Sequence, residues 1–323
     1  MQPLNTSSNK FIYFSSASST QSFLRKCYER ENNPEADLKS FENCYPFMYY
    51  LEHGQTYYNQ AQIAPLSLKP VLLFYGFVQL LKACLLTLDS NYPESTTDLA
   101  HGVTTRKRKK QQYEFMFDEV KVQKNGLFTN IAEKMFHMKH LESEKYTMEQ
   151  LLREIPELKD CHLYLASKKT FQELKSAGEV YQLPIAILSS FNMTENRFNG
   201  YLESKLSSSI NMTSNSSSIS LSVEQGLLVN QDSPIHYHMF EKSFMLSLNK
   251  SSPCYLFPEL MIHYLVLYNL SMISRYETEW WSELLKTAPN DDYPYISEFL
   301  NISQDKTPFL VFEWLMKERL NTK

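Results

Sequence analysis

Glycine is scarce and widely spaced along this chain, and this limits the folds that the chain can adopt. The 323 residues include only 7 glycines, and the closest neighbours, such as Gly54 and Gly76, stand 22 residues apart. Dinucleotide-binding and P-loop folds need several glycines close together, so that backbone amides can reach phosphate. Loops of both kinds are therefore excluded.

The 5 cysteines are scattered and odd in number, and none forms a CxxC pair. Disulfide frameworks and zinc clusters need cysteines that are paired or regularly spaced. We therefore expect reduced thiols in a cytoplasmic protein, with no metal and no other cofactor. The first residues, MQPLNTSSNK, lack the basic start and apolar stretch of a signal peptide, which agrees with this expectation.

One apolar stretch, Val71 to Leu88, is long enough to resemble a membrane span. Gln79 and Lys82 lie in its middle, and a lysine at the centre of a bilayer costs ~2.5–3.5 kcal/mol on insertion scales. A core helix buried in protein is the better interpretation. We therefore expect no membrane association.

Apolar residues recur at helical spacing near both ends of the chain, above all in 67–89 and 257–321. The expected fold class is mainly α, a helical bundle core with a small α/β insert in the middle of the chain. Short alternating runs and Ser/Asn-rich loops in 160–250 favour strands there. The expected organisation is an N-terminal helical region at 1–145, a mixed α/β insert at 146–250, and C-terminal helices at 251–323 that pack on the N-terminal body.

Three local predictions concern prolines and the N-terminus. The segment around Phe11 to Phe14 is predicted to be loose or strand-like, and Pro46 is expected to interrupt a helix at 35–62. Thr307 followed by Pro308 is typical of an N-cap and a first helical position. These two residues therefore predict the start of a separate C-terminal helix.

Two polar residues stand out in and after the apolar helix at 67–89. Lys82 lies within an apolar surface, where it could bind an anion or pair with a carboxylate, or extend its ammonium to solvent from the helix edge. His101 precedes Gly102 after a polar loop, where it could act as an acid, a base or a phosphate contact. The alternative is that His101 is a turn residue only.

A core helix ends at Arg275 and Tyr276, beside acidic and aromatic residues. Arginine is a good bidentate ligand for anions. It is an equally good structural clamp that would pair with Glu277, Glu279 or helix carbonyls. Arg275 and Tyr276 are therefore candidate ligand-binding residues, and His263, earlier in the same helix, is expected to be a core residue.

A run of basic residues follows His101: Arg106, Lys107, Arg108, Lys109 and Lys110. Such a run could contact a protein partner or nucleic acid. It has no interleaved aromatic residues, however, and the chain has a net charge of −4. A solvated loop is the simpler interpretation, and nucleic acid is not an expected partner.

Sequence patterns of known enzymes are missing. The chain contains no GxSxG, HExxH, DxDxxG or HxE…PCxxC pattern. We therefore name no catalytic residue and no metal ligand, and favour a protein without enzymatic activity.

Several segments together resemble the YaaC-like protein family of bacilli. They are KPVLLFYGFVQLLKACLL at 69–86, the following His-Gly pair, EQLLREIPEL at 149–158, and HYLVLYNLSMISRYETEWW at 263–281, so the resemblance extends over essentially the whole chain. The family is largely uncharacterised. In bacilli its gene lies beside that of IMP dehydrogenase, so the resemblance implies a link to purine nucleotide metabolism.

The N-terminal helices also resemble the HEPN superfamily of helical bundles, many of which are ribonucleases with an Arg-x4–6-His motif. This chain departs from that motif. The nearest pair is Arg153 and His162, which is too widely spaced and has Pro156 between its members. Bundles of this kind without the motif commonly act as binding modules.

These observations favour a cytoplasmic regulatory or protein-interaction protein without catalytic activity. A protein partner is expected, with IMP dehydrogenase as the named possibility. Two alternatives stay open: a HEPN-like ribonuclease or nucleotide-processing enzyme that uses Lys82, His101 and Arg275, and a sensor of purine nucleotides or small anions. Both alternatives depend on whether these three residues meet.

Overall fold

A computed structural model describes residues 10–105, 113–178, 180–206, 208–224 and 226–321. The chain divides into two units. We call residues 1–148 with 263–323 the helical unit and residues 149–262 the α/β unit.

The helical unit begins with a short 3-10 helix, Lys10–Phe14, followed by three α-helices. Ser16 caps the first of them, because its side chain accepts a hydrogen bond from the backbone N–H of Ser19. Pro70 stands in the first turn of the third, where its missing N–H costs nothing. The helices are α1 (Ala17–Arg30), α2 (Ala36–Ile63) and α3 (Lys69–Leu88).

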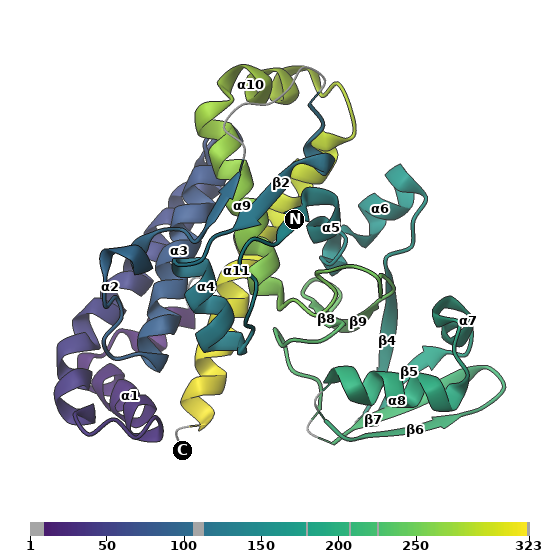
Figure 1. The fold of residues 1–323 in the computed structure, drawn as a ribbon, viewed down its shortest axis with the longest axis horizontal. Coiled ribbons are helices and arrows are strands. Elements are labelled where there is room, and N and C mark those ends of the chain that lie inside the picture. The colour runs from purple at the N-terminus through teal and green to yellow at the C-terminus, as the bar shows by residue number, and fades with distance from the viewer. Residues whose placement is uncertain (1–9, 106–112, 179, 207, 225, 322–323) are drawn as a thin grey trace. The chain divides into compact units, whose positions relative to one another are not determined.

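Helices α2 and α3 lie side by side (Figure 1) and approach closely at two glycines. A Cβ atom on Gly54 would lie 2.5 Å from Cδ2 of Leu80, and a Cβ atom on Gly76 would lie 2.9 Å from Cβ of Tyr57. Neither position has room for a side chain. The two glycines therefore bring the backbones together and fix which residues of the two helices face each other.

The C-terminal part of the chain adds three helices, α9 (Glu259–Tyr276), α10 (Thr278–Thr287) and α11 (Asp292–Asn321). Between Leu260 and Ile273, α9 is buried on nearly every side, as expected for a central helix that is apolar all round. Tyr264 of α9 packs edge-to-face on Phe74 of α3, with ring centroids 5.4 Å apart.

Between α3 and α9 the unit contains short elements and a three-stranded antiparallel sheet. The sheet pairs its strands in chain order. Two consecutive helical turns, one α and one π, follow the second strand and lead into the third. The elements are β1 (Val103–Thr105), β2 (Glu119–Val122), α4 (Leu127–Asn130), the π-helical turn Ile131–Met135 and β3 (Lys145–Thr147).

The α/β unit is built on a six-stranded antiparallel sheet with the order β6-β7-β5-β4-β9-β8. Helix α8 lies across the sheet (Figure 1), and its Phe198 and Leu202 are fully buried against Ile219 and Leu221 of β7. The elements are α5 (Met148–Leu152), α6 (Lys159–Ala166), β4 (Phe171–Ala177), β5 (Val180–Pro184), α7 (Ile187–Phe191), α8 (Glu195–Leu206), β6 (Ile210–Ser214), β7 (Ser218–Val223), β8 (Ile235–His238) and β9 (Ser243–Ser247).

A carboxyl group is fully buried inside the α/β unit. Glu154 is 0% exposed and accepts hydrogen bonds from the Ser247 hydroxyl at 2.7 Å and the Asn249 amide at 3.1 Å. Burial raises the pKa of Glu154 to about 7, because an ionised carboxylate is poorly solvated there.

The mainly α fold class is confirmed, but the three local predictions are wrong. Residues 10–14 form a 3-10 helix rather than a strand, and Pro46 lies inside a continuous α2. Thr307 and Pro308 likewise lie inside a continuous α11, where the Thr307 hydroxyl donates to the Ser303 carbonyl instead of capping a new helix. Packing of long helices has outweighed the local preference of proline to end them.

Helix α3 is the one helix in the described part of the chain that is long and apolar enough to cross a membrane. Its most apolar window is 67% buried inside the protein. This burial is what a core helix requires, and it agrees with the prediction made from Gln79 and Lys82.

Candidate functional site

His101 lies where the chain leaves the polar loop after α3 and enters β1. Its backbone carbonyl accepts hydrogen bonds from the Tyr264 hydroxyl at 2.8 Å and the Phe128 N–H at 3.2 Å. The next residue, Gly102, has φ of +75°, and a Cβ atom on Gly126 would lie 2.4 Å from its nitrogen. Two touching glycine backbones therefore hold the chain at His101 in place.

The imidazole of His101 is half-buried among aromatic rings. It packs edge-to-face on Phe74, Tyr75 and Tyr268, with centroid separations of 5.0, 6.0 and 5.7 Å. Its Nδ1 atom is buried and has no hydrogen-bond partner among the described residues. A buried polar atom without a partner is unfavourable and needs an explanation.

Burial lowers the pKa of His101, and the positive charges of Arg275 and Lys82 lower it further. All three causes oppose protonation. His101 is therefore neutral at pH 7, and its ring can both donate and accept a hydrogen bond.

Arg275 ends α9 and reaches across to α3. Its Nη1 donates to the hydroxyl of Tyr75 at 3.1 Å, and its Nε donates to the carbonyl of Ser271 at 3.0 Å. The guanidinium lies over the rings of Tyr75 and Tyr276, 5.7 and 5.2 Å from their centroids. Tyr276 itself is 63% exposed. Among the described residues, Arg275 forms no ion pair with Glu277 or Glu279, but it does form the predicted hydrogen bond with a helix carbonyl, that of Ser271.

Lys82 lies two turns beyond Tyr75 on the same helix and is also half-buried. Its ammonium is 5.7 Å from the ring centroid of Tyr50 on α2. Burial lowers its pKa. Within the described part of the chain, neither Lys82 nor Arg275 forms an ion pair with a carboxylate.

We call Tyr75, Lys82, His101 and Arg275 the His101 cluster. Tyr75 contacts both His101 and Arg275, and Lys82 lies near enough for its charge to lower the pKa of His101. Tyr75, which joins His101 to Arg275, was not predicted. The available signal was its place seven residues before Lys82, on the same helix face.

A second buried polar atom lies near the cluster. Tyr92 is 5% exposed, and its hydroxyl has no hydrogen-bond partner among the described residues. The Tyr92 hydroxyl interacts electrostatically with the hydroxyls of Tyr50 and Tyr264. The ring of Tyr50 lies under Lys82, and the ring of Tyr264 packs on Phe74, which also contacts His101. Burial raises the pKa of Tyr92, so its hydroxyl keeps its proton and can donate a hydrogen bond.

The remaining sequence candidates lie elsewhere. His263 is fully buried, stacks on Phe299 and exchanges a hydrogen bond with Ser303 at 2.8 Å, as expected of a core residue. The basic run from Arg106 to Lys110 falls outside the described residues. No group of three or more potential metal ligands occurs among the residues that the structure describes.

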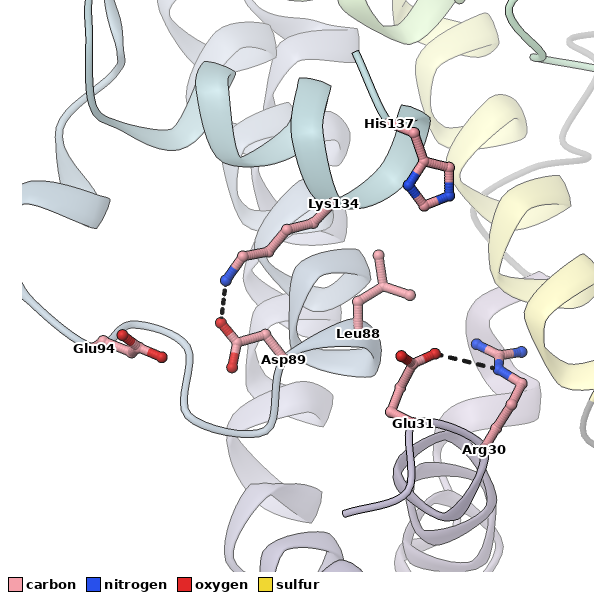
Figure 2. Close-up of a pocket in the computed structure, with 7 residues that line it drawn as sticks. All are labelled: Arg30, Glu31, Leu88, Asp89, Glu94, Lys134 and His137. Atoms are coloured by element: carbon pink, nitrogen blue, oxygen red, sulfur yellow. Dashed lines mark hydrogen bonds and ion pairs between the residues drawn. The ribbon is translucent and has the colours of Figure 1, made fainter. Parts of the chain in front are cut away.

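A groove of about 820 Å³ opens elsewhere in the helical unit, where α1, α3 and the π-helical turn end (Figure 2). Its lysine and its arginine are both paired with carboxylates, Lys134 with Asp89 and Arg30 with Glu31. Leu88 is its one apolar lining residue, so the groove offers little to an aromatic or apolar ligand. Its lining residues are Arg30, Glu31, Leu88, Asp89, Glu94, Lys134 and His137.

Comparison with known proteins gives one match. The family model described as YaaC-like Protein matches residues 12–315, nearly the whole chain. No curated protein and no solved structure matches. The resemblance to HEPN bundles therefore stays a prediction.

Proposed function

We propose that this chain, which belongs to the YaaC-like protein family, is a binding protein for a small phosphorylated molecule. The observation that carries the proposal is a pair of half-buried cations in the His101 cluster. These cations, Lys82 and Arg275, have no carboxylate partner among the described residues. A desolvated charge without a counter-ion is unfavourable. An anionic ligand would relieve that cost for both cations.

The side chains of the His101 cluster suit a phosphorylated ligand. The planar guanidinium of Arg275 can present two N–H groups to phosphate oxygens. Neutral His101 and the hydroxyl of Tyr75 add hydrogen-bonding groups, and the half-buried rings of Tyr57 and Tyr75 offer apolar surface to a base or sugar. A purine nucleotide is therefore the first ligand class to test.

A thermal-shift panel tests this proposal with wild-type protein, Arg275→Gln and Lys69→Gln. The tryptophans, Trp280, Trp281 and Trp314, all lie in the helical unit, so their fluorescence reports its unfolding. A ligand at 100 times its Kd stabilises by about 2.7 kcal/mol, or roughly 5–10 °C for a unit of this size.

We expect purine nucleotides to raise the Tm of the wild type and of Lys69→Gln, but not of Arg275→Gln. Lys69 is a matched control because it is a half-buried cation on the same helix, bonded to Asn301 and away from the cluster. No shift of the wild type with any purine nucleotide or with inorganic phosphate would refute the proposal.

A second function, the docking of a protein partner, is favoured by an exposed apolar row on α2. Leu38, Phe41, Tyr45 and Tyr49 are 52, 68, 54 and 59% exposed, and their spacing places them on one helix face. The rings of Tyr45 and Tyr49 lie 6.0 Å apart. A row one helix wide is too narrow for an interface of ordinary size, and it fits the apolar face of one amphipathic partner helix.

Binding of purified IMP dehydrogenase, the partner expected from the family resemblance, tests this second function by calorimetry. We expect Phe41→Asp to abolish binding and Phe117→Asp to leave it intact, since Phe117 is 66% exposed but belongs to a separate 3-10 helix, Phe115–Phe117, and not to the α2 row. Failure of the wild type to bind would reject this partner. Equal binding by Phe41→Asp would reject the α2 row as the surface.

A further inference from the structure

The two cations of the His101 cluster stand at opposite ends of one helix face. Tyr75, Gln79 and Lys82 of α3 are half-buried and spaced four and three residues apart, so they share that face. Seven residues separate Tyr75 from Lys82, which corresponds to about 10 Å along the helix axis. Arg275 binds at the Tyr75 end.

Each cation is held over a tyrosine of its own. The Arg275 guanidinium lies 5.7 Å from the ring centroid of Tyr75, and the Lys82 ammonium lies 5.7 Å from that of Tyr50. On α2, Tyr57 follows Tyr50 by seven residues, and its ring is 6.4 Å from that of Tyr75. The close approach of α2 and α3 thus places two cation–tyrosine pairs along one pair of helices.

Neither pair contains a carboxylate within the described residues, so each has an unneutralised positive charge. The two cations lie over different rings, Arg275 over Tyr75 and Lys82 over Tyr50, so each offers a separate position for an anionic group. His101 packs on Tyr75 at the Arg275 end, and its Nδ1 atom has no hydrogen-bond partner among the described residues.

We propose that the ligand of the His101 cluster carries two anionic groups, one bound by Arg275 and the other by Lys82. A ring or sugar body would join them and contact Tyr57 and Tyr75 at the Arg275 end. The chemical class is a molecule with two separate anionic groups, such as a nucleoside phosphorylated at two positions of its sugar. This inference rests on the proposed function and specifies its ligand.

Isothermal titration of two probes separates the two ends of the site. Adenosine 3′,5′-bisphosphate carries both anionic groups, and adenosine 5′-monophosphate carries one. We expect the bisphosphate to bind the wild type at least about tenfold more tightly, since a hydrogen bond to a charged group contributes about that much. Lys82→Gln should weaken the bisphosphate more than the monophosphate and so remove most of this advantage.

Three further variants keep the test decisive. Arg275→Gln should weaken the binding of both probes, and Lys69→Gln should change the affinity for neither. Lys82→Arg keeps the positive charge and should retain the preference for the bisphosphate, so it serves as the second test if Lys82→Gln folds poorly. Equal affinity of the wild type for both probes, with Lys82→Gln without effect on either, would overturn the two-anion inference. The proposed function would then still stand on the monophosphate and Arg275. Binding of neither probe nor inorganic phosphate would remove the proposed function itself.

Discussion

Gly54→Ala should destabilise the helical unit although alanine favours helix. In the interior of a helix, alanine is more favourable than glycine by about 1 kcal/mol. At Gly54, however, the new Cβ atom would lie 2.5 Å from Cδ2 and 2.8 Å from Cγ of Leu80, where carbon atoms require about 3.5–4.0 Å. Leu80 is 0% exposed and cannot move into solvent. Overpacking of this kind costs about 1–3 kcal/mol, and subtracting the helix preference leaves a net loss of up to about 2 kcal/mol.

Gly200→Ala provides the matched control. Gly200 lies in α8, and a Cβ atom there meets nothing within 4 Å, so only the helix preference of alanine acts. Urea unfolding followed by tryptophan fluorescence measures the helical unit, and hydrogen exchange of the α8 amides measures the control. We expect a lower urea midpoint for Gly54→Ala and slower exchange for Gly200→Ala. A midpoint for Gly54→Ala at or above that of the wild type would refute the close-packing argument.

Three further predictions follow from other contacts. Thr307→Val should destabilise the helical unit by about 1–3 kcal/mol in urea unfolding. The Thr307 hydroxyl donates to the Ser303 carbonyl and so accepts from the buried Tyr58 hydroxyl at 2.5 Å, which valine would leave without this partner. Thr56→Val, at an exposed hydroxyl, is the control and should have little effect. The pKa of about 7 for Glu154 lies above its unfolded value of about 4.3, so this carboxyl removes stability as pH rises between these values, whereas buried His162, whose pKa is lowered to about 4, adds stability. Glu154→Gln should therefore make the stability of the α/β unit, measured by hydrogen exchange of β9, rise more steeply with pH than in the wild type, and parallel profiles of the two proteins would contradict the assignment. RNA incubated with the wild type or with His101→Ala should stay intact on a denaturing gel, and cleavage by the wild type alone would revive the ribonuclease alternative.

The helices that dominate the fold were predictable because their signals are local. Pro70 in a first turn and a long apolar run predict a core helix at 67–89, and α3 occupies Lys69–Leu88. Pro46 and Pro308 gave the opposite signal, because proline removes a helical hydrogen bond and is expected to end a helix. Both helices continue through these prolines. The burial of Leu310 and Val311 beyond Pro308 shows that contacts distant in sequence maintain α11 there, and those contacts cannot be read from a short window.

The His101 cluster illustrates the same limit at the level of a site. The sequence indicates Lys82, His101 and Arg275 individually, because each is a charged residue or a histidine next to an apolar helix. Their proximity in the fold joins residues up to 193 positions apart along the chain, which a local pattern does not predict. The residue that joins them, Tyr75, looks like an ordinary core aromatic in sequence. Its role follows only once Gly54 and Gly76 have brought α2 against α3, because that approach sets Tyr57 against Tyr75. For this reason Gly76→Ala, which would place a Cβ atom 2.9 Å from that of Tyr57, should weaken nucleotide binding as well as stability. A site assembled by close helix packing depends on the smallest residues near it as much as on its charged ones.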